Sequence, residues 1–212
     1  MERSRGIEPL ALAWKAKVLP LYELRVLNTY MIITPVDKQN NLFSVENVYS
    51  AELIAEIRKL NLMTYPYEKV NWQEHMPRRK LQFSDTDILA RINVENTANI
   101  PKISEAIGIA IKDVDTAIWV DHNQFTMGVH EDNPLVDIAM QVYLFPNLVE
   151  IGTKFYHTLQ KNSLRHDFPY IVNTGYIMIN APGQFHGATR PTPKSTLRCS
   201  SYSYFSRIKS TE

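Results

Sequence analysis

The stretch MGVHEDNPLVDIAMQVYLF, from Met127 to Phe145, places two possible metal ligands before a turn and a long apolar run. Successive side chains of a strand point to opposite faces, so His130 and Asp132 would point one way and Glu131 the other. The Asn133–Pro134 turn would leave this pair at the end of a strand. A His-x-acid pair also arises easily by chance in a chain with 6 His and 22 Asp and Glu residues. By itself, the stretch indicates either half of a metal site or a half-exposed hairpin end.

Short strand-like runs extend from Thr116 almost to the C-terminus. They are rich in β-branched and aromatic residues, and turn residues separate them at roughly ten-residue spacing. The runs are TAIWV (116–120), FTMGVH (125–130), VDIAMQVYLF (136–145), TKFYHTL (153–159), YIVNT (170–174), YIMINA (176–181) and STLRCSSYSYF (195–205). This pattern predicts an antiparallel sandwich or jelly roll.

The residues before this core predict two strands and two helices. MIITPV (31–36) and LFSVENV (42–48) have strand character. Residues 50–62 begin with a capping serine and carry apolar residues at helical spacing, and residues 99–114 form a second amphipathic pattern with Pro101 in its first turn. The expected fold is therefore mainly β with N-terminal helices.

The segment between the two predicted helices, residues 64–83, is polar, aromatic and punctuated by proline, which predicts a long excursion. Within it, residues 65–80 are expected to form either a substrate lid or a solvated loop. We expect a single domain over residues 31–212, with supporting elements in 31–114 and the barrel-like core in 115–206. Residues 1–30 have no clear helical or strand period, and we expect them to be a non-native or disordered extension before a natural start at Met31.

Composition excludes several classes of protein. The net charge of +1 gives no reason to expect nucleic acid or an anionic membrane surface as a partner. The single cysteine, Cys199, excludes an internal disulfide and a thiolate-rich metal site, so any metal would be held by His and carboxylates. We expect a cytoplasmic protein without a membrane-spanning helix.

A second group of candidate site residues lies near the C-terminus. His186 follows a Pro–Gly turn, and Arg198 and Ser200 share one face of the predicted last strand with Tyr202 and Tyr204. A buried guanidinium is costly unless it meets an anion. A ligand carboxylate bound by Arg198 and capped by the Ser200 hydroxyl would supply that anion.

His130-x-Asp132, His186 and Arg198-x-Ser200 together resemble the iron(II)/2-oxoglutarate-dependent oxygenase family, and most of all its prolyl-hydroxylase-like branch, over about residues 115–206. The resemblance implies a double-stranded β-helix, which is a cupin-like jelly roll. It also implies that His130, Asp132 and His186 hold Fe(II), with O2 as the oxidant. Asp132 argues for hydroxylation, because related halogenases have a small residue at that position.

The same resemblance assigns the 2-oxoglutarate site. Arg198 would pair with the distal carboxylate of this cosubstrate, Ser200 would donate beside it, and Tyr143 would make a second contact. The implied reaction is the hydroxylation of a small-molecule or peptide substrate, coupled to oxidative decarboxylation of 2-oxoglutarate to succinate. A peptidyl prolyl residue or a free amino acid is the leading expectation for the substrate.

Several assignments stay open on the sequence alone. Lys194 or Arg190 could take the place of Arg198 as the carboxylate partner, and Gln124 or Gln141 could take the place of Tyr143. A non-catalytic jelly-roll binding protein, or a cupin-like metalloenzyme that does not use 2-oxoglutarate, would also fit the strand pattern. The sequence does not predict an oligomeric state.

Overall fold

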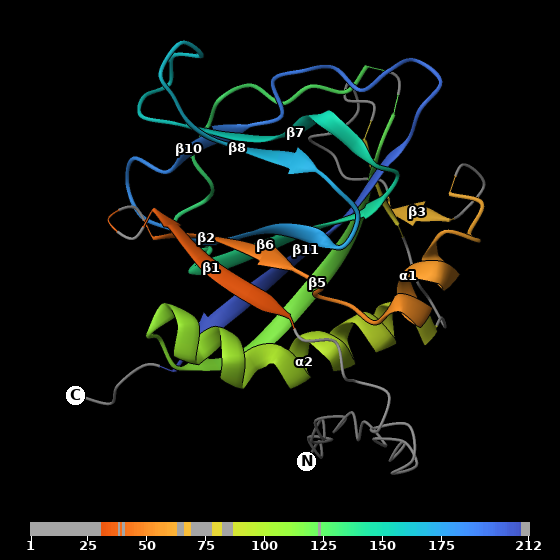
Figure 1. The fold of residues 1–212 in the computed structure, drawn as a ribbon, viewed down its shortest axis with the longest axis horizontal. Helices are drawn as coiled ribbons and strands as arrows, with labels where there is room; N and C mark the ends of the chain where they lie inside the picture. Colours follow the sequence, from red (N-terminus) through yellow and green to blue (C-terminus); the bar gives the residue numbers. More distant parts are fainter. Residues whose placement is uncertain are drawn as a thin grey trace, which may run out of the picture.

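Two antiparallel β-sheets face each other in the structure, which is a computed structural model and describes residues 31–37, 39, 41–62, 66–68, 78–81, 87–122 and 124–208. The large sheet contains, in spatial order, β1 (Ile32–Asp37), β2 (Leu42–Glu46), β9 (Thr174–Ile179), β6 (Ile138–Phe145), β11 (Arg198–Arg207), β5 (Ile111–Asp121), β4 (Arg78–Leu81) and β3 (Tyr67–Glu68). The small sheet contains β10 (Phe185–Gly187), β7 (Leu148–Tyr156) and β8 (Leu164–Tyr170). The helices α1 (Ala51–Ile57) and α2 (Asp87–Ile107) precede β5, and α2 runs across the outer face of the large sheet (Figure 1). The predicted mainly β architecture is confirmed, and its two antiparallel sheets are consistent with a jelly roll.

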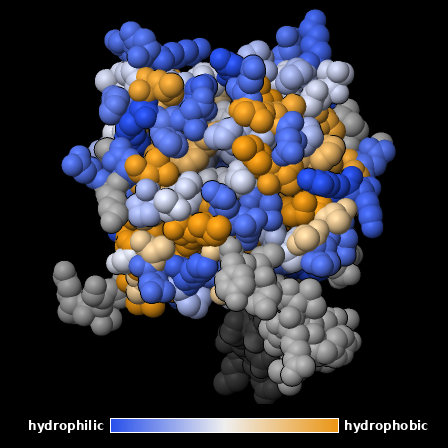
Figure 2. Space-filling view, viewed as in Figure 1, coloured by the Kyte–Doolittle hydropathy of each residue, from blue (hydrophilic) through white to orange (hydrophobic). Residues whose placement is uncertain are grey.

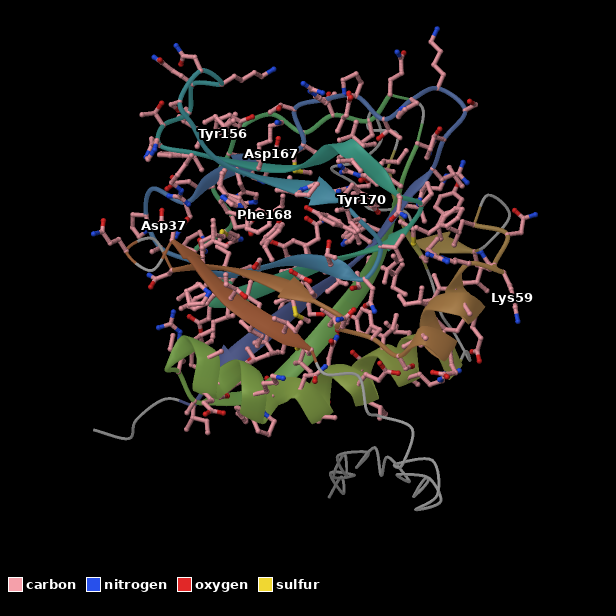
Figure 3. All side chains as sticks on the ribbon, in the orientation of Figure 1. Asp37, Lys59, Tyr156, Asp167, Phe168 and Tyr170 are labelled. Carbon is pink, nitrogen blue, oxygen red and sulfur yellow. The ribbon has the colours of Figure 1, made fainter. Side chains whose placement is uncertain are left out.

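The central strand β6 shows how the sequence builds two cores. Its residues alternate between the faces of the large sheet, so Met140 and Val142 pack toward the helices while Ala139 and Tyr143 pack between the sheets. The inner core is aromatic, and Figure 3 places Phe168 and Tyr170 of β8 in the space between the two sheets. Gln141 also lies on the inner face and is buried, which makes it a polar position within this core.

The first predicted helix is present, although shorter than expected. Ser50 caps α1, because its hydroxyl accepts a hydrogen bond from the Leu53 amide at 3.3 Å. The buried Glu95 of α2 accepts from both the Ser50 amide (2.8 Å) and the Ser50 hydroxyl (2.7 Å), so the two helices meet at this cap.

The prediction for the second helix is wrong in its bounds. The helix does not span residues 99–114: α2 covers Asp87–Ile107 with Pro101 in its interior, and the chain enters β5 at Ile111. The buried side of α2 contains Glu95 and Asn96, which interrupt the apolar pattern. Asn96 donates to Thr116 of β5 (3.0 Å) and to Ser203 of β11 (2.9 Å), so tertiary partners satisfy an amide that the sequence pattern alone counts as solvent-exposed.

Several strand predictions also change. In the predicted run 125–130 only His130 makes a ladder contact, as an isolated bridge, and residues 171–173 form the turn between β8 and β9. The sequence pattern predicts no strand over residues 164–169, which form most of β8. The excursion contributes β3 and β4 to the edge of the large sheet. The predictions for residues 1–30 and for most of residues 65–80 fall outside the described residues.

The surface seen in Figure 2 mixes polar and apolar side chains, with hydrophilic residues gathered along the upper edge, over β7 and β8 of Figure 1. Among the described residues, no helix combines the length and the apolar character that crossing a membrane would require.

Candidate functional site

The three predicted metal ligands come together at the edge of the small sheet. His130 forms the isolated bridge with His186 of β10: the His130 amide donates to the His186 carbonyl at 2.9 Å, and the reverse bond measures 2.8 Å. Asp132 follows two residues after His130, and one ligand atom from each of the three side chains lies within 4.8 Å of the others. The structure therefore brings the three residues together, and their role as metal ligands stays a prediction.

Backbone carbonyls orient both imidazole rings. The Nδ1 atom of His130 lies 2.8 Å from the Gly128 carbonyl, and that of His186 lies 3.1 Å from the Gln184 carbonyl. Because a carbonyl only accepts, each Nδ1 carries the proton and each Nε2 keeps its lone pair. The two Nε2 atoms are 3.7 and 3.6 Å from Oδ1 of Asp132, too far for good hydrogen bonds. Two imidazoles and a carboxylate arranged in this way fit a divalent iron ion.

A tyrosine holds the carboxylate of Asp132. The Tyr202 hydroxyl donates to Oδ2 at 2.6 Å, which leaves Oδ1 directed at the histidines. Burial would raise the pKa of Asp132, but the hydrogen bond from Tyr202 and the neighbouring histidines hold that pKa below its ordinary value. Burial lowers the pKa of His186, which favours the neutral, ligating form. Glu131 is exposed and accepts from the Gly183 amide at 2.5 Å, so it points away as the strand period predicts.

A cavity of roughly 490 Å³ opens beside these ligands, between the two sheets. A polar network centred on Gln141 forms part of the cavity wall. The side-chain oxygen of Gln141 accepts from Thr153 (3.1 Å) and Tyr176 (2.9 Å), and its amide nitrogen donates to Ser200 (3.1 Å). These four residues come from β6, β7, β9 and β11, so the network joins the two sheets.

Arg198 lies at the buried end of the cavity and already has an anionic partner in this chain. Its Nε and Nη2 atoms donate to Oδ2 of Asp121 at 2.9 and 2.6 Å, and its Nη1 donates to the Ile151 carbonyl at 2.8 Å. The expectation that a buried Arg198 requires a ligand carboxylate is therefore corrected, because Asp121 supplies a negative charge.

Asp121 pairs with a second arginine as well. Arg78 of β4 donates from Nε to Oδ1 at 2.5 Å and from Nη2 to Oδ2 at 3.2 Å. Burial would raise the pKa of Asp121, but the two guanidinium groups hold that pKa below its ordinary value. One carboxylate thus lies between two cations, and both arginines line the cavity.

The other residues predicted as contacts for the cosubstrate lie either in the protein interior or at its surface. Ser200 is buried behind the cavity wall, and the Tyr143 hydroxyl is used internally: it accepts from the Thr153 amide at 3.1 Å and donates to the Phe168 carbonyl at 3.4 Å. Neither Ser200 nor Tyr143 is among the residues that line the cavity, whereas Gln141 is. Three residues considered as cosubstrate contacts lie at the surface instead: Lys194 and Gln124 are exposed, and Arg190 pairs with Glu150 at 3.0 Å.

Sequence reasoning missed Asp121, the site role of Arg78 and the contact of Tyr202 with Asp132. In the sheet register Asp121 lies opposite both Arg198 and Arg78. Strand alternation places Asp121 on the same face as Trp119, but no local pattern indicates which residues lie opposite it.

Comparisons with known proteins agree with this fold. No protein-family model and no curated protein sequence matches the chain. A Trichoplax adhaerens prolyl hydroxylase, solved with a hypoxia-inducible factor oxygen degradation domain peptide, superposes with a TM-score of 0.60 at 12% identity, covering 89% of this chain and 94% of that one. A Pseudomonas putida prolyl-4-hydroxylase gives a TM-score of 0.56 at 10% identity, covering 80% and 94%. HygX from Streptomyces hygroscopicus, solved with nickel and 2-oxoglutarate, gives 0.57 at 12% identity, covering 88% and 87%. The chain therefore shares the fold of these oxygenases, as the resemblance in its sequence predicts.

Proposed function

We propose that the protein is an Fe(II)/2-oxoglutarate-dependent dioxygenase whose two sheets form a double-stranded β-helix. It would hydroxylate a substrate and convert 2-oxoglutarate to succinate. The observation that carries this proposal is the geometry of His130, Asp132 and His186, whose three donor atoms lie within 4.8 Å of one another beside a cavity. The similarity in fold to HygX, which was solved with nickel and 2-oxoglutarate, supports the proposal.

Each ligand has a defined part in holding the metal. The Nε2 atoms of His130 and His186 would donate neutral lone pairs, and Oδ1 of Asp132 would supply the negative charge. Three protein ligands leave further coordination positions open, as an oxygenase requires. Bound iron would supply the oxidising chemistry that couples decarboxylation of the cosubstrate to hydroxylation.

The cavity's charges suit a dianionic cosubstrate. Two arginines against one aspartate leave a net positive charge at the cavity wall, and a divalent metal on Asp132 would add another. Arg198 keeps two donor hydrogens beyond those bound to Asp121 and Ile151, so we assign it to the distal carboxylate of 2-oxoglutarate. Gln141, Thr153 and Tyr176 line the same cavity and would provide the neutral polar contacts. Ser200 would act indirectly, because its hydroxyl accepts a hydrogen bond from the Gln141 amide and so orients that side chain.

The decisive experiment measures succinate formation. Anaerobically purified protein receives Fe(II), 2-oxoglutarate and then oxygen, with His130→Ala as the test variant and His157→Ala, an exposed histidine, as the control. We expect succinate from the wild type and from His157→Ala, and none above background from His130→Ala. Calorimetry on metal-loaded protein tests 2-oxoglutarate binding separately.

The outcomes distinguish this function from two competing ones. If the protein binds neither metal nor 2-oxoglutarate, the proposed dioxygenase function is refuted and a non-catalytic jelly-roll protein is the better description. If it binds metal but not 2-oxoglutarate, a cupin-like metalloenzyme becomes the better description. A peptidyl prolyl residue and a free amino acid remain the proposed substrate classes, because one fold relative was solved with a peptide and cavities of this size hold small molecules.

A further inference from the structure

Arg78 offers the cavity a second cationic group, separate from Arg198. Its contacts with Asp121 use Nε and one hydrogen of Nη2, which form one edge of the guanidinium fork. A guanidinium carries five donor hydrogens, and within the part of the chain that the structure describes Nη1 and the outer hydrogen of Nη2 have no hydrogen-bond acceptor, so they form a second edge that can bind another carboxylate. The rings of Phe125 and Trp119, with centroids 4.3 and 5.4 Å from the guanidinium carbon, hold its plane in place.

The two arginines differ in their surroundings. The Arg198 side chain is 2% exposed and lies over Tyr170, at the buried end of the cavity. The Arg78 side chain is 11% exposed and comes from β4, a strand near the edge of the large sheet. Asp121 carries one negative charge, so it neutralises one of the two guanidinium groups. If Arg198 takes the cosubstrate carboxylate, Asp121 balances the charge of Arg78, and what Arg78 offers the rest of the cavity is the unused edge of its guanidinium fork.

We propose that Arg78 binds a carboxylate of the primary substrate, which makes the substrate a small free carboxylic acid, such as an amino acid, rather than an internal residue of a peptide. This inference rests on the proposed function and narrows its two substrate classes to one. An internal peptide residue offers single carbonyl oxygens, which would leave one of the parallel donor hydrogens on the second edge of Arg78 without an acceptor, whereas a carboxylate accepts both. A carboxylic acid would replace the lost hydration of Arg78 with a bidentate, charge-assisted contact.

The test uses acetate as the carboxylate probe and acetamide as its neutral counterpart. Protein loaded with paramagnetic Co(II) and saturated with 2-oxoglutarate, without oxygen and at constant ionic strength, is titrated with each probe. Relaxation of the probe's methyl protons reports binding near the metal. We expect acetate to bind more tightly than acetamide, and Arg78→Met to weaken acetate by about tenfold or more while 2-oxoglutarate affinity changes far less.

Arg79→Met is the matched control, because Arg79 is the next residue of β4, lies over Tyr67 and is not among the cavity-lining residues. It should leave acetate binding unchanged. Arg78→Lys keeps the charge without the fork, so it should weaken acetate less than Arg78→Met does, and it serves as the test if the methionine variant does not fold.

The failures of the two proposals are distinguishable. The role of Arg78 is overturned if the wild-type protein binds 2-oxoglutarate but not acetate, or if acetate binding persists in Arg78→Met. The proposed dioxygenase function would stand in both cases. Equal loss of acetate and 2-oxoglutarate in Arg78→Met assigns this arginine to the cosubstrate and also overturns the inference. Wild-type protein that binds neither Co(II) nor 2-oxoglutarate removes the proposed function itself.

Discussion

Asp121→Asn isolates the one carboxylate that joins the two arginines of the cavity. Asp121 is fully buried, and it accepts hydrogen bonds from both Arg78 and Arg198. Asparagine keeps the shape of the side chain but removes its charge. The change therefore leaves two guanidinium groups facing a neutral amide in the interior of the protein.

The expected loss of stability is large. Removing one partner of a buried ion pair costs about 3–5 kcal/mol, because the other charge remains desolvated. Arg198, with a side chain 2% exposed, is subject to this cost in full, and Arg78 adds less because it reaches solvent. We expect Asp121→Asn to lower the free energy of unfolding by about 3–5 kcal/mol, a large share of the roughly 5–15 kcal/mol of a typical domain.

Urea unfolding at neutral pH measures this difference. Asp113→Asn is the matched control, since Asp113 lies on the same strand, is exposed and forms an ion pair at 3.6 Å with the exposed Lys112. The control should change the free energy of unfolding by less than about 0.5 kcal/mol.

The dependence on pH adds a second test. The pKa of Asp121 is lower in the folded protein than in the unfolded chain. The stability it contributes is therefore fully present above its unfolded pKa, near about pH 4, and is lost as the pH falls through the folded value. The difference between wild type and Asp121→Asn should shrink on acidification below about pH 4. A loss below about 1 kcal/mol at neutral pH, or a difference that grows in acid, would refute the reasoning.

Three further predictions concern the metal site and the core. Tyr202→Phe removes the hydrogen bond to Asp132 and should weaken metal binding by about 10–100-fold, as measured by competition with a chelator. Gly187→Ala should displace the loop that carries the first histidine and reduce metal affinity, since an added Cβ would lie 2.7 Å from the Gly128 carbonyl oxygen. Asn96→Ala leaves core hydroxyls without their amide donor and should lower the free energy of unfolding by about 1–3 kcal/mol in urea titrations.

Each of these predictions has a control or a contradicting result. Tyr204→Phe should keep wild-type metal affinity, because no hydrogen bond from Tyr204 to Asp132 is present among the described residues. Gly128→Ala should also be tolerated, since an added Cβ there meets nothing within 4 Å. Unchanged metal affinity in Tyr202→Phe or Gly187→Ala would contradict the geometry of the site. Wild-type stability of Asn96→Ala would show that the buried amide is replaceable at no cost.

Local patterns suffice for some elements of the fold and fail for others. The apolar run along residues 136–145 predicts β6, and Ser50 predicts the start of α1. Helix α2 was misplaced because Glu95 and Asn96 break its apolar pattern. Their partners, among them Ser203, lie far away in the sequence. Polar residues inside a core are invisible to a periodicity argument until the groups that satisfy them are known.

The sequence by itself determined that the protein is mainly β, that His130 and Asp132 share a face while Glu131 does not, and which histidine near the C-terminus completes the group. The strand content and the shared direction of His130 and Asp132 follow from strand alternation, which is a local property of the backbone, whereas the choice of His186 follows from the resemblance to the oxygenase family. Only the tertiary structure decided that Asp121 lies between Arg78 and Arg198, that Tyr202 holds Asp132, and that Gln141 rather than Tyr143 faces the cavity. The physical reason is that these contacts depend on register and on packing between strands distant in the chain, which no local period encodes.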